Sequence, residues 1–191
     1  MCGRVQLDLE LNSLAMQRLC DLLAKEFPDN TIKSGEKYPS DLLPIFTRGD
    51  DKPKLHLMNW GFPFPGSKKL VINARSETAA TKPMFKKSME QYRCIIPTTG
   101  FYEWTHDREK IKYLFRLSQE PILYLAGLYR RYDDKERFVI LTQGANDSII
   151  DVHGRMPVII PEKQIRAWLN DKSAADAMLA DSGANLIRYA I

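Results

Sequence analysis

The chain has 191 residues, of which 44% are hydrophobic and 27% are charged. This length and composition favour one compact domain, residues 1–191, and exclude a disordered, collagen-like or repeat architecture. No segment approaches the roughly 20 consecutive apolar residues that cross a bilayer, and the N-terminus lacks the apolar core of a signal peptide. We therefore expect a monomer located in the cytoplasm, without a membrane partner.

The formal net charge of +4 mildly favours a polyanionic partner. The three cysteines, Cys2, Cys20 and Cys94, cannot all pair with one another. None of them lies in a CxxC motif or in a Cys/His cluster with the spacing of zinc ligands. We therefore expect no disulfide, no metal site and no cofactor.

The first part of the chain predicts a short strand, a helix and a loop. The run CGRVQL predicts a strand over 2–7, and leucines on one face predict an amphipathic helix over about 12–27. Asn12 or Ser13 is the expected N-cap of this helix. The polar, turn-rich segment 28–43 predicts an ordered loop that crosses the surface and could border a site.

Short β-type runs, mostly bounded by Gly, Pro or Asp, dominate the rest of the chain, at 42–46, 54–60, 70–74, 93–98, 111–118, 121–132, 137–143 and 157–161. Helices are expected at about 83–91, at 147–152 and after Pro161, and Ser173 with Asp176 resembles a capping box. These elements predict an α+β fold, with a β-barrel-like curved sheet as its core and peripheral helices.

The N-terminus offers a candidate nucleophile. Removal of Met1 would leave Cys2 with a free α-amine beside its thiol. The α-amine has an ordinary pKa of about 8, against about 10.4 for lysine, so more of it is neutral and can form a Schiff base with an aldehyde. The thiol can then close a five-membered thiazolidine. The competing interpretation is an ordinary second residue without chemistry. Arg4 could bind an anion.

The segment NARSET places an amide and a guanidinium two residues apart. In a strand, Asn73 and Arg75 point to the same face, which suits a phosphate next to a polar reaction centre. A purely structural role is equally compatible with this spacing, and Glu77 could instead neutralise Arg75 or cap the chain.

Two further segments contain candidate proton-transfer groups. Glu103 is flanked by aromatic residues, which would desolvate its carboxyl group and raise its pKa, although a strand glutamate paired with an arginine is the simpler interpretation. His153 lies in DVHGRMPVII and could move protons, with Arg155 as a phosphate contact. The contexts of His56 and His106 suggest no chemistry.

The loop NWGFPFPGSKK interleaves aromatic residues with prolines before two lysines. Trp60, Phe62 and Phe64 could stack on bases or wedge between them, or could instead close the core. The core interpretation is favoured for Trp60.

Taken together, MCGR, NARSET, GFYEW and HGRMPV occur in the order and approximate spacing of the SOS response-associated peptidase (SRAP) family. The chain resembles this family over nearly its whole length. The resemblance implies a barrel-like fold, a positively charged groove for single-stranded DNA or its junction with duplex, and a thiazolidine crosslink between Cys2 and the opened sugar of an abasic site. Such a crosslink would shield the lesion.

By the same resemblance, Cys2 is the nucleophile, Asn73 orients the reacting centre, Glu103 is the acid/base and His153 assists Schiff-base chemistry and reversal. Phosphate contacts are implied for Arg4, Arg75 and Arg155. Lys82 is expected to compensate for Pro83, which stands where the family often has a basic residue, and the loop after Trp60 differs from the family's bulky tryptophans. Self-processing that removes Met1, an AP-lyase side activity, nucleoid association and proximity to replication machinery are also implied.

Two alternatives belong to other classes. An N-terminal-nucleophile glutamine amidotransferase also begins Met-Cys-Gly, but it requires a four-layer sandwich and attacks a carboxamide. A non-catalytic single-stranded DNA-binding module would bind reversibly and would not need Cys2.

Overall fold

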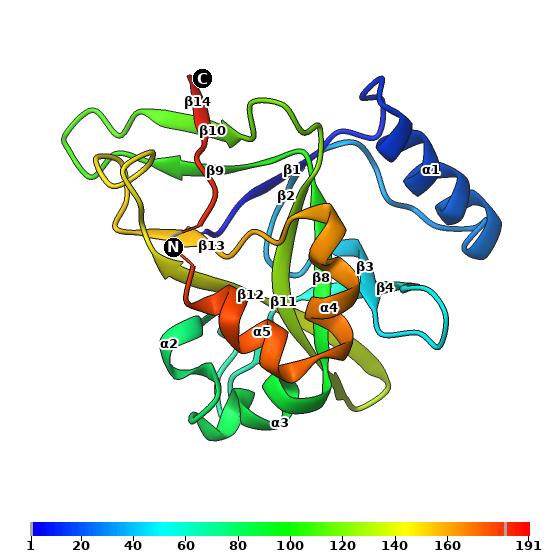
Figure 1. Ribbon diagram of the computed structural model, residues 1–191. Helices are drawn as coiled ribbons and strands as arrows, with labels where there is room; N and C mark the ends of the chain where they lie inside the picture. Colours follow the sequence, from blue (N-terminus) through cyan, green and yellow to red (C-terminus); the bar gives the residue numbers. More distant parts are fainter. Residues whose placement is uncertain (1, 182) are drawn as a thin grey trace.

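The computed structural model describes residues 2–181 and 183–191. Within these residues a ring of strands runs in the order β11 (Leu123–Tyr132), β8 (Arg93–Thr98), β3 (Leu42–Thr47), β4 (Lys54–Trp60) and β12 (Lys135–Gly144), and β12 pairs with β11 to close it. The β12–β4 pair is parallel and the other neighbours in the ring are antiparallel. The expected α+β fold with a barrel-like core is therefore confirmed (Figure 1).

Strand β12 extends beyond the ring and carries two short strands at its end. The parallel strand β7 (Asn73–Arg75) pairs Arg75 with Thr142, and the antiparallel strand β13 (Arg155–Pro157) pairs Pro157 with the same residue. The segments NARSET and HGRMPV, which are about 80 residues apart in sequence, are thereby brought to one end of β12.

A second sheet lies beside the barrel, with the order β14 (Ile187–Ala190), β10 (Lys112–Arg116), β9 (Gly100–Trp104), β1 (Val5–Leu7) and β2 (Gly35–Lys37). Strand β9 follows β8 almost directly, so the chain passes from the barrel into this sheet. Strand β14 has no counterpart among the expected elements, and β2 lies within the segment expected to be a loop.

Close packing fills the barrel. Trp60 is fully buried and stacks on Phe138, with ring centroids 6.2 Å apart. Gly127 is paired to both β8 and β12. A Cβ at this position would lie 2.4 Å from Ile96 Cδ1 and 2.8 Å from the Val139 carbonyl oxygen, so a side chain does not fit there.

Helices cover the outside of the barrel: α1 (Leu14–Glu26), α2 (Ser76–Ala79), α3 (Pro83–Gln91), the 3-10 turn η1 (Glu162–Gln164), α4 (Ile165–Asn170) and α5 (Lys172–Leu179). Figure 1 shows α4 and α5 across the front, α2 and α3 at the bottom and α1 standing apart at the right. The side chain of Ser13 accepts a hydrogen bond from Met16 N at 3.2 Å, which makes Ser13 the N-cap of α1. A two-stranded ribbon of β5 (Phe62–Pro63) and β6 (Leu70–Val71) completes the described elements.

Three predicted details were wrong. Residues 147–152 form turns instead of a helix, because Asn146 binds Ser148 and the carbonyls of Gly183 and Ala184 through its side chain. Asp171, not Ser173, caps α5, by accepting from Ala174 N. The strand expected at 157–161 ends at Pro157 and is followed only by an isolated bridge at Ile159.

None of the helices in the described ranges is both long and apolar enough to span a membrane.

Candidate functional site

The β1–β9 pairing brings the N-terminus to Glu103. Val5 lies opposite Phe101, and Tyr102 N donates to the Arg4 carbonyl oxygen at 2.9 Å. Continuing this antiparallel register places Gly3 opposite Glu103. Cys2 is therefore the neighbour of the residue that lies opposite Glu103 across the two strands.

Asn73 fixes the main chain of Cys2. Its side-chain Nδ2 donates to the Cys2 carbonyl oxygen at 2.9 Å. Asn73 itself is held in β7 opposite Ile140 of β12. The Cys2 side chain is fully buried among core residues. The structure thus brings two of the four expected catalytic residues into direct contact, although Met1 lies outside the described residues.

Burial changes the protonation of both reactive groups. It raises the pKa of the Cys2 thiol, and the negative charge of Glu103 raises that pKa further. Burial also raises the pKa of the Glu103 carboxyl group, which is only 5% exposed. A carboxyl group with a raised pKa is available as a proton donor closer to neutrality, and a protonated thiol reacts best with an electrophile that is already activated.

His153 lies in the loop between β12 and β13. Its Nδ1 lies 2.9 Å from the Arg155 backbone nitrogen and 3.1 Å from the Arg155 carbonyl oxygen, so the main chain of Arg155 holds the ring in place. Burial lowers the pKa of His153, so the neutral form is favoured. The His106 ring lies 5.0 Å from the His153 ring, centroid to centroid.

His106 is a residue that sequence reasoning missed. It lies in the turn after β9 and its side chain is exposed. The residues around it in the sequence gave no sign of a functional role. The two rings become neighbours because the fold brings the β9–β10 hairpin next to the loop that carries His153.

Arg155 is held by other residues of the chain. It forms a two-pronged ion pair with Glu77, in which Nη2 lies 2.9 Å from Oε2, and it donates to the Thr142 carbonyl oxygen at 2.6 Å. This hydrogen-bonded pairing lowers the pKa of Glu77 to about 2. Glu77 therefore neutralises Arg155, whereas the side chain of Arg75 makes no hydrogen bond or ion pair with the described residues.

Arg4 lies in a second charged cluster. Its guanidinium donates to Glu36 at 3.1 Å and covers the Tyr38 ring, with 4.0 Å from Cζ to the ring centroid. Lys112 also binds Glu36 and lies over the Tyr102 ring. Two cations thus share one carboxylate, so the cluster keeps a net positive charge that can attract an anion. Sequence reasoning did not identify Lys112.

An open groove of about 730 Å³ runs past Asn73 and Arg75. Its other lining residues are Phe64, Val71, Lys82, Pro83, Met84 and Phe85. Phe64 is half exposed, and Arg75 and Lys82 are exposed. The groove therefore combines a hydrogen-bonding amide, two cations and an aromatic ring next to Cys2.

The expected base contacts of Trp60 and Phe62 need correction. Both side chains are fully buried. The Trp60 indole donates to the Ile72 carbonyl oxygen at 2.9 Å, and Phe62 packs against Tyr132. These rings belong to the core, and Phe64 alone of the three is accessible to a base.

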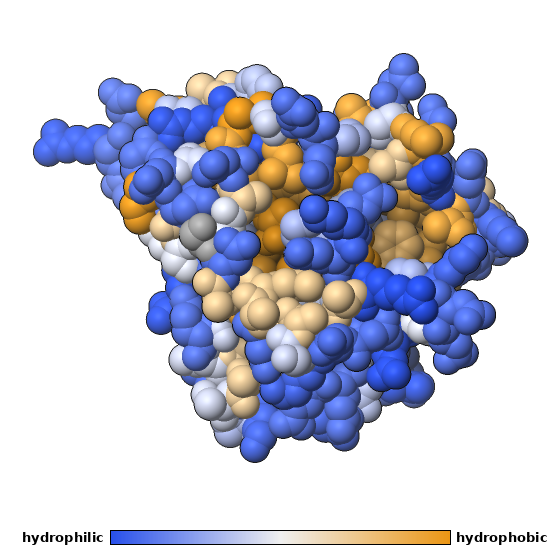
Figure 2. Space-filling model, in the orientation of Figure 1, coloured by the Kyte–Doolittle hydropathy of each residue, from blue (hydrophilic) through white to orange (hydrophobic). Residues whose placement is uncertain are grey.

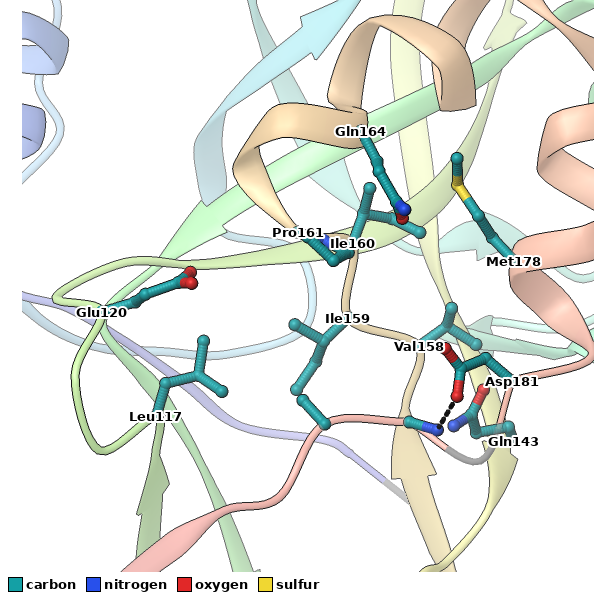
Figure 3. A pocket seen from close by; sticks show the side chains of 12 residues that line it. Leu117, Glu120, Gln143, Val158, Ile159, Ile160, Pro161, Gln164, Met178 and Asp181 are labelled. Carbon is teal, nitrogen blue, oxygen red and sulfur yellow. Dashed lines mark hydrogen bonds between the residues drawn. The ribbon is translucent and has the colours of Figure 1, made fainter.

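Figure 3 shows a different pocket, of about 160 Å³, which contains none of the candidate site residues. Apolar side chains such as Leu117, Ile159 and Met178 line it, with Glu120 and Asp181 among the polar residues. In Figure 2 an apolar strip lies in the hollow between the sheet that contains β9 and β10, at the top of the view, and helices α4 and α5.

Nowhere in residues 2–181 and 183–191 do three or more His, Cys, Asp or Glu side chains gather in a way that could hold a metal ion.

The chain is similar to several known proteins. The abasic site processing protein YoqW of Bacillus subtilis (strain 168) is 32% identical over 192 residues, which cover 91% of this chain and 82% of YoqW. The abasic site processing protein YedK of Escherichia coli (strain K12) is 29% identical, over 90% of this chain and 81% of YedK. A crystal structure of a protein from Bacteroides thetaiotaomicron superimposes with a TM-score of 0.81 and 26% identity, covering 100% of this chain and 92% of that one.

The four motifs lie in one structural neighbourhood, and the barrel differs from the four-layer sandwich that an amidotransferase of the N-terminal-nucleophile class requires. The family described as SOS response associated peptidase (SRAP) matches residues 1–189. The chain belongs to the SRAP family.

Proposed function

We propose that this protein recognises abasic sites in single-stranded DNA and forms a covalent thiazolidine with them through Cys2, after removal of Met1. The observation that carries the proposal is the 2.9 Å hydrogen bond from Asn73 Nδ2 to the Cys2 carbonyl oxygen. This hydrogen bond anchors Cys2, which carries the reactive amine and thiol, to a residue that lines the groove. Relatives named abasic site processing proteins support the choice of substrate.

The reaction begins with the sugar of the abasic site, which is in equilibrium with an open-chain aldehyde. Glu103 donates a proton to the ring oxygen as the C1–O bond of the ring breaks, and the anomeric hydroxyl loses its proton as it becomes the aldehyde oxygen, so the carboxyl group is restored with no net proton change. The neutral α-amine of Cys2 attacks the aldehyde carbon, and loss of water gives an imine. The S–H bond then adds across the C=N bond, so that sulfur joins carbon and the hydrogen joins nitrogen. The sum is one water released, with no oxidant or reductant.

The order of steps follows from the electrostatics. A buried thiol with a raised pKa is a poor first nucleophile. A neutral amine is a better one, and the imine it forms activates the carbon that the thiol then attacks. His153, held neutral by burial, can accept or return a proton during imine formation and its reversal.

The groove beside Asn73 accounts for DNA binding in this proposal. Arg75 and Lys82 contact phosphates and Phe64 stacks on a base. Arg155 is neutralised by Glu77, so its contribution to phosphate binding is smaller than that of Arg75. The cluster of Arg4 and Lys112 attracts the strand on the other side of Cys2.

Two side activities fit the same groups. An imine that does not close to a thiazolidine promotes β-elimination, which nicks the strand as an AP lyase does. Self-processing would free the Cys2 amine by cleaving the bond after Met1. Association with the nucleoid and with replication machinery is the expected setting for either activity.

The deciding experiment mixes Met1-processed protein with an oligonucleotide that contains one abasic site, and looks for a shifted band after denaturation. An oligonucleotide with a tetrahydrofuran residue serves as control because it cannot open to an aldehyde. Protein that verifiably retains Met1 should give no heat-stable adduct, because its Cys2 nitrogen is part of an amide. An equal yield of adduct from that protein would overturn the proposal and favour a reversible DNA-binding module.

A further inference from the structure

A second cleft lies outside the candidate site, between α3 and the hairpin of β11 and β12. Its volume is about 430 Å³, within the range of about 300 to 1,000 Å³ that is typical of small-molecule sites. Figure 1 shows α3 and this hairpin at the lower end of the barrel. None of the residues that line the cleft belongs to the candidate site or to its groove.

A buried hydroxyl group lines this cleft. Ser88 is 1% exposed, and its Oγ has no hydrogen-bond partner among the described residues. A hydroxyl buried without a partner costs free energy, which a ligand recovers by bonding to it. The position is thus better explained by ligand binding than by packing, for which alanine would serve equally well in a helix.

Two tyrosines supply aromatic surface. The rings of Tyr92 and Tyr129 meet edge to face, with centroids 5.4 Å apart at 76°. Both are only partly buried and both line the cleft. Burial raises the pKa of Tyr129 to about 12, so its phenol stays neutral and can donate a hydrogen bond.

The charges around the cleft are mostly positive. Lys87, Arg130 and Arg131 line it. Within the described parts of the chain, Lys87 and Arg130 form no ion pair, whereas Arg131 lies 3.7 Å from Asp134. The one carboxylate in the lining, Glu136, lies 3.3 Å from Nδ1 of His56.

We propose that this cleft binds a nucleotide, with its base against Tyr92, its phosphate on Lys87 and Arg130, and a polar edge on the Ser88 hydroxyl. A simple anion would not need the aromatic wall, and an apolar ligand would not need the cations. Binding of a nucleotide here does not depend on the chemistry of Cys2.

The position of α3 connects this cleft with the groove. Residues at its N-terminal end line the groove, and residues at its C-terminal end line the cleft. The helix has nine residues and so rises about 13 Å. A DNA strand in the groove can therefore continue along α3 into the cleft. This extension, unlike the nucleotide site itself, rests on the proposed function.

The test measures binding of a fluorescent, undamaged oligo-dT by anisotropy over a series of salt concentrations, and binding of dTMP and inorganic phosphate by calorimetry. The variants are Ser88→Ala, Tyr92→Leu and Arg130→Gln. Lys25→Gln on α1 removes the same charge elsewhere and is the control. Because the DNA is undamaged, failure of crosslinking at Cys2 would leave this result intact.

We expect Ser88→Ala to weaken dTMP binding by about threefold to tenfold, as loss of one hydrogen bond does, without lowering Tm. Tyr92→Leu should weaken it as well. Arg130→Gln should reduce the slope of log K against log salt for oligo-dT by about one, and Lys25→Gln should not. Loss of dTMP binding with unchanged oligo-dT binding would identify the ligand as a free nucleotide and not a strand of DNA.

Three results would overturn the nucleotide site. One is inorganic phosphate that binds as tightly as dTMP, because the base would then contribute nothing. Another is an affinity for dTMP that stays at the wild-type value in all three variants. The third is a lower Tm for Ser88→Ala, since this would mean that the hydroxyl stabilises the fold.

Discussion

The side chain of Asn73 holds the carbonyl oxygen of Cys2, with 2.9 Å between Nδ2 and oxygen, across 71 residues of sequence. This hydrogen bond ties the N-terminal segment to the end of β12. In the proposed reaction it orients the amine and the thiol of Cys2 without touching either. Its loss should therefore change the rate of crosslinking more than the affinity for DNA.

Asn73→Ala should slow formation of the heat-stable adduct by about threefold to tenfold, the usual worth of one hydrogen bond. Asn59→Ala is a matched control, because the Asn59 side chain donates to the Ser40 carbonyl oxygen at the same distance of 2.9 Å. The rate of crosslinking in a single turnover, at saturating abasic DNA, is measured for both variants. Equal slowing in the two variants would mean that Asn73 acts only through general stability.

Cys2→Ser separates the two nucleophiles. Serine keeps the α-amine after Met1 removal but lacks the sulfur that closes the stable ring. We expect little heat-stable adduct, an imine that borohydride traps, and strand nicking by β-elimination. Cys20→Ser removes a different free thiol and should crosslink like the wild type. Durable adduct from Cys2→Ser without reduction would show that the thiol is not needed.

Glu103→Gln tests the proton donor. We expect the single-turnover rate to fall by about 10² to 10⁴, the usual worth of general acid catalysis. The pKa of Glu103 is raised by burial, and the acid is active when protonated. The contribution of Glu103 is therefore lost as pH rises through this raised pKa, and the variant should lack that limb of the pH profile. Glu26→Gln, an exposed change on α1, is the control. An unchanged rate and profile in Glu103→Gln would remove Glu103 from the mechanism.

The barrel and most of its strands could be predicted from sequence because alternation and turn residues are local signals. The runs at 54–60 and 93–98 match β4 and β8 residue for residue. Strand β14, with all its side chains exposed, has no burial pattern, and β2 is only three residues long. Neither could be recognised locally, since each exists only through pairing with a neighbouring strand.

The internal pairings of the candidate site could not be predicted from the sequence. Spacing places Asn73 and Arg75 on one face, as the groove confirms. It cannot show that Glu77 pairs with Arg155, because this pair joins residues 78 positions apart. The burial of Phe62 could not be read from its sequence either, since its partner Tyr132 comes from a hairpin 70 residues later.

Arg75→Ala should weaken binding to undamaged single-stranded DNA and make its salt dependence shallower, with the slope of log K against log salt reduced by about one. Arg75 is exposed in the groove and has no ion-pair partner among the residues described, so Tm should stay the same. Arg155→Ala should change the slope less, because Glu77 already neutralises that charge. An unchanged slope for Arg75→Ala would assign this arginine a role outside DNA binding.

The pair of Glu77 and Arg155 also makes a prediction about acid stability. The hydrogen-bonded arginine lowers the pKa of Glu77 to about 2 in the folded protein, against about 4.3 for an unperturbed glutamate. A carboxyl group with a lowered pKa stabilises the fold fully above its unfolded pKa, and this contribution is lost as pH falls from about 4.3 towards 2. The Glu77 side chain is 51% exposed, so solvent screening keeps the effect near 1 kcal/mol, roughly the upper end for surface pairs.

Glu77→Gln should therefore lower the free energy of unfolding by about 1 kcal/mol at pH 7, and the difference from the wild type should shrink as pH falls below 4. Urea denaturation at a series of pH values measures it. Asp176→Asn is a suitable control, because Asp176 pairs with Lys172 at 2.7 Å within one exposed helix and should contribute less. A constant difference between Glu77→Gln and the wild type from pH 7 to pH 3 would contradict the prediction, because only the ionised carboxylate can bind the guanidinium as an ion pair.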